Sequence, residues 1–256
     1  MKARFDRLVL ELWLPTVLVA VWWTASARSS SFFFPPLAEI LKTFRSMWLF
    51  RLVRTQVLPS LVHLAEGLAM ACILGICLGL LFGLARRLYD AVRPLFEFAR
   101  ATPGVAILPI ALVFFGPGTS MKVFVIFFGA FWPVFLNTID GVRSLDPIVR
   151  DTARAFNLSM RDRVFKVLLP AASPQILTGV RISVSLGVVL IVASEYIAST
   201  EGIGYVELQS ARTFAITEMW SALLLLGVLG YVVNLIYRLI EHRLLAWHRG
   251  LHATST

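Results

Sequence analysis

Residues 58–85 read LPSLVHLAEGLAMACILGICLGLLFGLA, and this stretch decides the fold class. A helix needs about 20 apolar residues to cross a bilayer core about 30 Å thick, so the stretch is long enough to span a membrane. The whole chain of 256 residues is 58% hydrophobic and only 15% charged. Soluble domains usually carry about a quarter charged residues. We therefore predict an all-α, polytopic membrane protein rather than a soluble domain.

Six apolar blocks meet this length requirement. They cover 8–26, 58–85, 94–115, 121–139, 176–198 and 219–240. The third block contains Pro103, Gly104 and Pro109, so we expect that span to be kinked or partly unwound. Broken backbone is tolerated inside a membrane only where protein or a water-filled cavity satisfies it. Residues 102–109 are therefore a candidate lining of a pathway, and the alternative is a kink used only for packing.

The positive charges predict the orientation. With a cytoplasmic N-terminus, fifteen of the 24 Lys and Arg residues fall on the inner side and seven on the outer side. This excess predicts that both termini are cytoplasmic. We interpret the opening segment as an uncleaved first span rather than a signal peptide, and residues 1–256 as one transmembrane domain with a core over 58–240. Cys72 and Cys77 are interpreted as small buried residues, and no metal site is expected.

An amphipathic helix is expected on the outer surface over 36–50. Its apolar positions recur at helical spacing after Pro35-Pro36: Leu37, Ile40, Leu41, Phe44 and Trp48.

The most polar stretch lies over 140–170, on the inner side. Asp146 followed by Pro147 predicts the start of a short helix, and Asn157 predicts its end, because Asn tolerates the left-handed conformation. Ser159, with Asp162 three residues later, predicts the cap of a second short helix that ends before Pro170. We expect a cytoplasmic helix–turn–helix between spans four and five. The alternative is an ordinary basic loop held at anionic headgroups.

This stretch resembles the "EAA" loop of ATP-binding-cassette importer permeases. The family pattern is Glu-Ala-Ala, three residues, Gly, nine residues, Ile-x-Leu-Pro. Here the same spacing joins Asp151-Thr152-Ala153, Asn157 and Val167-Leu168-Leu169-Pro170. Asp in place of Glu keeps the carboxylate, and Thr in place of Ala is still small. Asn in place of Gly is, after Gly itself, the residue that best tolerates a left-handed turn. Segments similar to the nitrate/sulfonate/taurine branch are Arg100-Ala101-Thr102-Pro103, Gly179-Val180-Arg181, and Glu195 followed by Gly202-Ile203-Gly204-Tyr205.

The resemblance implies a permease subunit of a binding-protein-dependent importer in the bacterial inner membrane. It implies a second permease subunit, forming a homodimer, two ATPase subunits on the cytoplasmic side, an extracytoplasmic binding protein, and no nucleic acid. The residues expected to couple to the ATPase are Asp151, Thr152, Ala153, Arg154, Phe156, Asn157, Leu158, Arg161 and Pro170. Of these, Ala153, Phe156 and Leu158 would form an apolar knob, flanked by the charges of Asp151, Arg154 and Arg161.

The chain is not expected to be an enzyme. It has no Gly-x-x-x-x-Gly-Lys-Ser/Thr loop, so ATP and Mg²⁺ should bind to the partner ATPase and no cofactor to this chain. The pathway candidates are mostly small or polar residues in the spans: Thr102, Pro103, Val105, Asn137, Ser183, Ser185, Ser194 and Glu195. Ser and Thr also mediate helix packing, which is the alternative. Glu195 could hydrogen-bond the turn that follows it or form an outer gate, and we favour the structural role.

Three other classes of protein fit the sequence less well. A secondary transporter or channel usually shows paired charges or inverted repeats of broken helices, and one proline-broken span is evident here. A membrane enzyme needs an ionisable or metal cluster, and a scaffold would not need the coupling-loop spacing. The substrate implied by the branch is a small anion such as a sulfonate, taurine or nitrate, although pyrimidine and aromatic compounds are also carried in the branch.

Overall fold

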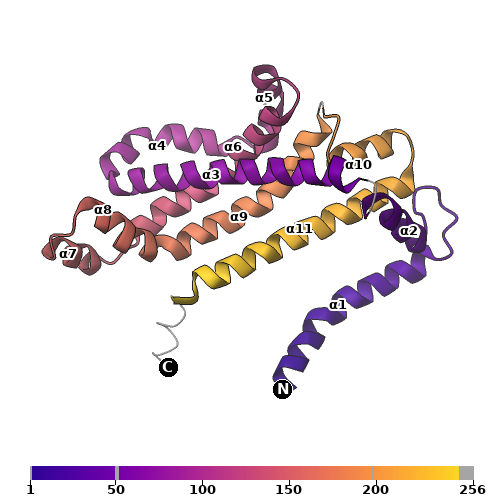
Figure 1. The fold of residues 1–256 in the computed structure, drawn as a ribbon, viewed down its shortest axis with the longest axis horizontal. Coiled ribbons are helices and arrows are strands. Elements are labelled where there is room, and N and C mark those ends of the chain that lie inside the picture. The colour runs from indigo at the N-terminus through magenta and orange to yellow at the C-terminus, as the bar shows by residue number, and fades with distance from the viewer. Residues whose placement is uncertain (1, 50–51, 198, 248–256) are drawn as a thin grey trace.

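The computed structural model describes residues 2–49, 52–197 and 199–247, and within these ranges the regular structure is entirely helical (Figure 1). The longer helices are α1 Lys2–Ser26, α2 Leu37–Trp48, α3 Leu58–Leu84, α4 Arg86–Ala101, α6 Thr119–Arg143, α9 Leu169–Tyr196, α10 Ile203–Arg212 and α11 Ile216–Leu244. The shorter ones are η1 Val53–Val57, η2 Gly104–Ile107, α5 Leu108–Phe115, α7 Pro147–Ala155, α8 Met160–Asp162 and η3 Arg163–Leu168. Of the last set, η1 and η3 are π-helical and η2 is a 3₁₀ turn. The predicted all-α class is confirmed.

Four helices in the described ranges are long and apolar enough to cross a membrane. They run over Val53–Leu84, Thr119–Arg143, Met160–Tyr196 and Ile216–Leu244. They contain the predicted fourth and sixth blocks completely, the second block up to residue 84 and the fifth block up to residue 196. Residue 198, the predicted end of the fifth block, lies outside the described residues. The first block corresponds to α1, whose apolar part Trp13–Ser26 is shorter. A sixth crossing therefore stays a prediction.

The third block is broken, as predicted from its prolines. Helices α4 and η2–α5 meet at an angle of 88° across a break at Thr102 and Pro103. Thr102 is extended, because a residue before proline avoids the helical region. This pair counts as a fifth span if it is taken as one broken crossing. The short helix α5 projects from the side of the bundle in Figure 1.

Helices α3, α6 and α9 form the centre of the bundle. Small residues allow the backbones to approach: a Cβ at Gly75 of α3 would lie 2.9 Å from Val134, and one at Gly79 would lie 2.5 Å from Thr138. On α9, a Cβ at Gly179 would lie 2.5 Å from the Pro133 carbonyl oxygen. Such small-residue contacts are the usual basis of helix packing in membranes. Cys72 is half-buried and Cys77 is exposed, so the predicted burial of Cys77 was wrong.

Helix α2 confirms the amphipathic helix predicted over 36–50, although residue 50 lies outside the described residues. Leu37, Ile40 and Trp48 are buried, whereas Leu41 is exposed. The Trp48 indole N–H donates to the Ser221 hydroxyl on α11 at 3.2 Å. The helix therefore packs on α11, because its apolar face finds a partner within the chain.

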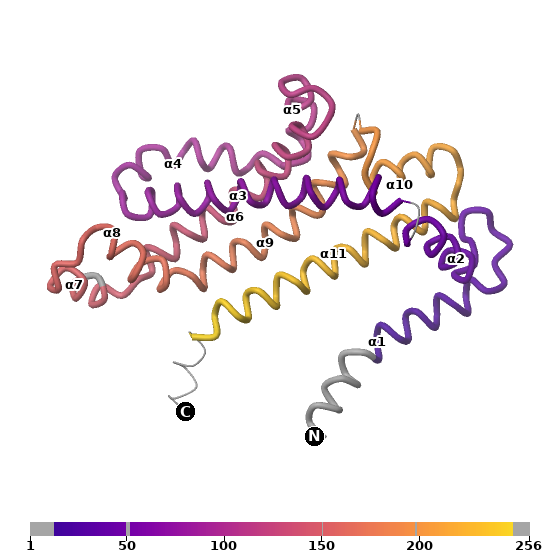
Figure 2. The backbone as a smooth tube through the Cα atoms, viewed as in Figure 1, coloured from indigo at the N-terminus to yellow at the C-terminus, as the bar shows by residue number. Residues whose placement is uncertain are grey.

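The coloured part of α1 and helix α11 run in opposite directions (Figure 2). The predicted cytoplasmic position of both termini requires this arrangement. Helices α7 and α8 lie at one end of the long helices, and α2 and α10 lie at the other end (Figure 1).

Candidate functional site

Helix α7 begins and ends as the sequence predicts. The Asp146 side chain accepts a hydrogen bond from the backbone N–H of Ile148 at 2.8 Å, and Pro147 occupies the first turn. At the other end, Asn157 has φ +49°. The N–H of Leu158 donates to the Ala153 carbonyl at 3.3 Å, and that of Asn157 donates to the Arg154 carbonyl at 2.9 Å. This pair of bonds is a Schellman cap, which requires a left-handed residue at Asn157.

The next cap is also present. Ser159 accepts from the backbone N–H of Asp162 at 3.2 Å, and its hydroxyl donates to the Asp162 carboxylate at 2.7 Å. The guanidinium of Arg163 donates to the Leu158 carbonyl at 2.9 Å. The turn between α7 and α8 is thus held by side chains at both ends, and it presents a fixed shape.

The tip of this turn is apolar and exposed. Ile148 is 71% exposed and Phe156 is 75% exposed, and Met160 is exposed beside them. Asp151 and Arg154 are also exposed and form an ion pair at 3.3 Å. We call Ile148, Phe156 and Met160 the coupling tip. Exposed aromatic side chains of this kind are typical anchors of protein interfaces.

The remaining predicted coupling residues lie in different surroundings. Ala153 is buried, so it supports the helix from within the chain instead of forming part of an exposed knob. Leu158 is partly buried, while Thr152 and Arg161 are exposed. A hollow of about 370 Å³ between α7 and η3 is lined by Ile148, Val149, Thr152, Ala153, Phe156, Leu158 and Val167.

The second predicted short helix does not end before Pro170. Met160–Tyr196 forms one continuous helix, in which α8 passes through η3 into α9. Pro170 lies in the first turn of α9, directly after the π-helical segment. The wider π turn accommodates the missing backbone N–H of proline. The coupling tip is therefore joined to the far end of the bundle by a single helix about 55 Å long at 1.5 Å per residue.

A buried hydrogen-bonded cluster lies at that far end. The Glu195 carboxylate accepts from the backbone N–H of Gly204 at 2.8 Å and from the Ser60 hydroxyl. The Ser60 hydroxyl also accepts from the N–H of Ile203 at 3.1 Å, and Gln56 accepts from the N–H of Gly202 at 2.7 Å. We call these residues the turn cluster, because they hold the turn before α10. Glu195 is only 1% exposed, which places it in the structural arrangement that the sequence analysis favoured.

The positively charged side chain of Lys122 lies beside the turn cluster. Lys122 is 2% exposed and lies at the start of α6. Its ammonium group donates to the Glu201 carbonyl at 3.4 Å and lies 3.9 Å from the Glu201 carboxylate. Sequence reasoning did not identify Gln56, Ser60 or Lys122 as partners of this turn, because nothing local in the sequence joins them to residues 201–204.

The pathway candidates separate into two groups. Thr102, Pro103, Val105, Asn137 and Ser185 are at least partly exposed. Ser183 and Ser194 are fully buried, and their hydroxyls donate to the carbonyls of Ala130 and Ile191. In this conformation the two serines mediate packing and do not face an opening, which corrects their expected position. Buried hydroxyl groups commonly satisfy backbone carbonyls in this way.

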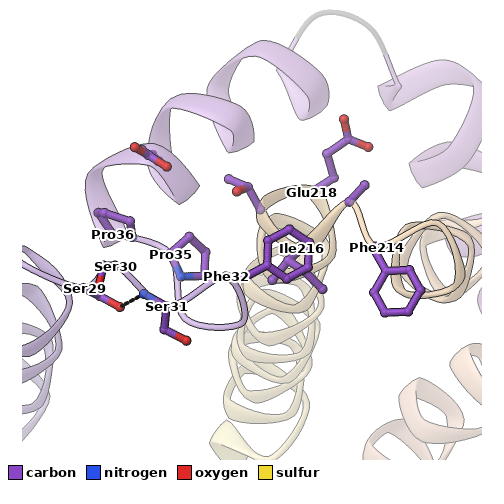
Figure 3. A pocket seen from close by; sticks show the side chains of 12 residues that line it. Ser29, Ser30, Ser31, Phe32, Pro35, Pro36, Phe214, Ile216 and Glu218 are labelled. Atoms are coloured by element: carbon purple, nitrogen blue, oxygen red, sulfur yellow. Dashed lines mark hydrogen bonds between the residues drawn. The ribbon is translucent and has the colours of Figure 1, made fainter.

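A large hollow lies between the loop after α1 and the α10–α11 turn (Figure 3). These segments are at the end of the bundle opposite α7 (Figure 1). Its volume is about 590 Å³, and its lining includes Ser29, Ser31, Phe32, Glu39, Phe214 and Glu218. Phe32 and Phe214 are exposed, and Phe214 has φ +57°. The rim is therefore partly aromatic and partly acidic.

The bundle of long apolar helices is that of a membrane protein. The family model described as "Binding-protein-dependent transport system inner membrane component" matches residues 73–246. The chain belongs to this family, as the coupling-loop spacing indicated. It is accordingly a multi-pass membrane protein, and the predicted class is confirmed.

Named relatives confirm the branch. The chain is 30% identical to a protein named as an aliphatic sulfonates transport permease, SsuC, of Bacillus subtilis, over 93% of this chain and 87% of the relative. It is 35% identical to the nitrate import permease protein NrtB of Synechocystis, over 73% and 68%. It is 29% identical to the taurine transport system permease protein TauC of Escherichia coli, over 94% and 90%.

A solved structure shares the fold. An inward-facing conformation of the MetNI methionine ABC transporter aligns with a TM-score of 0.66 and 22% sequence identity. The alignment covers 78% of this chain and 97% of that chain. The two chains thus share a fold.

Proposed function

We propose that this chain forms the substrate pathway of an ATP-driven importer and couples that pathway to a separate ATPase. Two copies would form the pore, with two ATPase subunits bound at the coupling tips. ATP and Mg²⁺ would bind to those subunits, and this chain would bind no cofactor. The coupling tip would then lie on the cytoplasmic side of the inner membrane, with both chain termini.

The observation that carries this proposal is the continuous helix Met160–Tyr196. It connects the turn that bears the coupling tip with Glu195, which holds the turn before α10. A rigid helix transmits a displacement of one end to the other, and rigid-body shifts of helices are a common means of switching. Movement of the tip, driven by the ATPase, would therefore reach the opposite opening of the pathway.

The expected orientation assigns the hollow of Figure 3 to one side of the membrane. The hollow lies at the end opposite α7, so a cytoplasmic coupling tip would place it on the outer face. Its aromatic and acidic rim suits a protein partner, because aromatic side chains are enriched at interfaces. We assign this face to contact with the extracytoplasmic binding protein.

The proposed substrate is a small oxyanion. The relatives are named for aliphatic sulfonates, nitrate and taurine, and each of these compounds carries an oxyanion group. Selection among these compounds is expected to reside in the separate binding protein.

Copurification tests the proposal. The chain should be expressed with the ATPase and binding protein encoded beside it and reconstituted in nanodiscs. We expect a stable complex whose ATP hydrolysis rises when the binding protein carries nitrate, taurine or an alkanesulfonate. A folded chain that binds no ATPase would contradict the proposal and would favour a secondary transporter.

A further inference from the structure

The exposed face of α9 carries a stripe of polar side chains. Gln175, Thr178, Arg181 and Ser185 are all exposed, and their spacing of three or four residues places them on neighbouring turns of one face. Gln175 donates to the Asn137 carboxamide oxygen on α6 at 2.9 Å. We call these four residues the α9 polar stripe.

The stripe lies between α6 and α11. On the α11 side, the Ser185 hydroxyl donates to the Asn234 carboxamide oxygen at 3.1 Å. The opposite face of α9 is apolar and packs on α3, where a Cβ at Gly187 would lie 2.9 Å from Leu64. The stripe therefore faces out of the chain, away from α3.

The exposed surface of α3 has a different character. Between Leu61 and Leu81, the exposed side chains of α3 are apolar except for Glu66. Ile73, in the middle of this surface, is 62% exposed. Such a surface suits lipid, whereas uncompensated polar and charged groups are costly in the hydrocarbon core. The α9 polar stripe differs from this surface of α3 and fits contact with water.

Arg181 is the cation of the stripe. It lies about 22 Å along the helix axis from Tyr196, within the long apolar helix Met160–Tyr196. The guanidinium group is paired with the Glu241 carboxylate of α11. The Arg181 side chain is 55% exposed and that of Glu241 only 11%, so the positive partner faces outward.

We propose that the α9 polar stripe lines a water-filled passage and that Arg181 is a binding site for an oxyanion within it. The inference rests on the proposed function for the existence of a passage, and it adds the residue that contacts the substrate and the chemistry that it recognises. A guanidinium group binds planar or tetrahedral oxyanions through two parallel N–H groups. Glu241 would hold Arg181 when no anion is present.

Thiol labelling tests this assignment directly. In a background of Cys72→Ala and Cys77→Ala, the Thr178→Cys variant of the full chain is placed in phosphatidylcholine nanodiscs, with and without the ATPase. Its modification rate is measured with methanethiosulfonate ethylsulfonate, an oxyanion, and with the cationic ethyltrimethylammonium reagent. Thr178 lies one turn from Arg181, so we expect the anion to react faster. Ile73→Cys is the control on the lipid-suited surface, and it should stay unreactive.

Two further substitutions give opposite expectations. Arg181→Gln leaves the Glu241 carboxylate and should lower the anion-to-cation rate ratio by about three- to tenfold, the scale of one charge acting over one helical turn in a polar medium. Glu241→Gln leaves the cation without its counter-charge and should raise the ratio. If Arg181→Gln does not fold, the Glu241→Gln variant still shows whether the charge of Arg181 raises the anion-to-cation rate ratio.

Several results would overturn the inference. A Thr178→Cys thiol that stays unreactive in both states would mean that lipid or protein covers the stripe. A ratio that neither substitution changes would exclude Arg181 as the anion site. If Arg181→Gln changes the anion-to-cation rate ratio only when phosphatidylglycerol is added to the nanodiscs, the ligand of Arg181 is a lipid headgroup. Labelling does not require ATP hydrolysis, so failure of the proposed coupling is detected separately.

Discussion

Glu195 on α9 accepts a hydrogen bond from the backbone N–H of Gly204, nine residues later, at 2.8 Å. The same carboxylate accepts from Ser60 on α3. One buried side chain therefore fastens the end of α9 both to α3 and to the start of α10. This relationship determines how motion of α9 would reach the turn before α10.

Replacing Glu195 with alanine should destabilise the protein. The substitution leaves the buried N–H of Gly204 without its acceptor, at a cost of about 1–3 kcal/mol, while the Ser60 hydroxyl can still donate to the Gln56 carbonyl at 3.0 Å. Thermal unfolding in detergent measures the loss. Glu66→Ala, which removes an exposed carboxylate on α3, is the control and should change stability little. Equal effects from both substitutions would refute the structural role of Glu195.

Gly202→Ala should also be destabilising. Gly202 has φ +117°, and a Cβ there would lie 2.2 Å from the Glu195 carboxyl carbon. Both the backbone conformation and the space therefore require glycine, and we expect a loss of at least about 1 kcal/mol. Gly227→Ala on α11, where a Cβ meets nothing within 4 Å, is the matched control. A Gly202→Ala variant as stable as the control would show that the turn rearranges freely.

Asn157 offers a test of the turn between α7 and α8. Asn157→Gly should preserve or slightly increase stability, because glycine adopts the left-handed conformation without steric cost. Asn157→Val should lower stability by about 1–2 kcal/mol, because a β-branched residue resists that conformation. The two variants are compared by thermal unfolding and by binding to the ATPase. The reverse order of stabilities would show that the Schellman cap does not hold this turn.

Phe156→Asp should separate folding from coupling. The Phe156 side chain is 75% exposed, so its replacement should alter stability by no more than about 0.5 kcal/mol. Because exposed aromatic residues often anchor interfaces, we expect at least about tenfold weaker binding of the ATPase. Phe32→Asp, at a phenylalanine that is 61% exposed beside the opposite hollow, is the control and should bind the ATPase normally. Unchanged ATPase binding by Phe156→Asp would remove the coupling tip from the proposed interface.

The sequence predicted the features that depend on local chemistry. Asp146, Pro147, Asn157 and Ser159 form the predicted caps because each cap depends on residues within five positions. The break of the third block followed from Pro103 in the same way. The membrane-protein class could be predicted from the length and composition of the apolar blocks alone.

Long-range contacts determined what was not predicted. Pro170 does not end a helix, because the π-helical segment before it absorbs the missing N–H. Ser183 and Ser194 are polar residues in a span, and only the packing of α6 and α9 shows that they are buried. The exposure of Thr178 depends likewise on how α9 packs against α3, α6 and α11, and periodicity alone cannot identify which face remains open.

Uptake by proteoliposomes that contain this chain, the ATPase and the binding protein tests the central claim most directly. We predict that labelled nitrate, taurine or alkanesulfonate accumulates only when ATP is present on the side of the coupling tip. Phe156→Asp should abolish this accumulation while the chain remains folded. Accumulation that proceeds without the ATPase and follows an ion gradient would contradict the account and identify a secondary transporter.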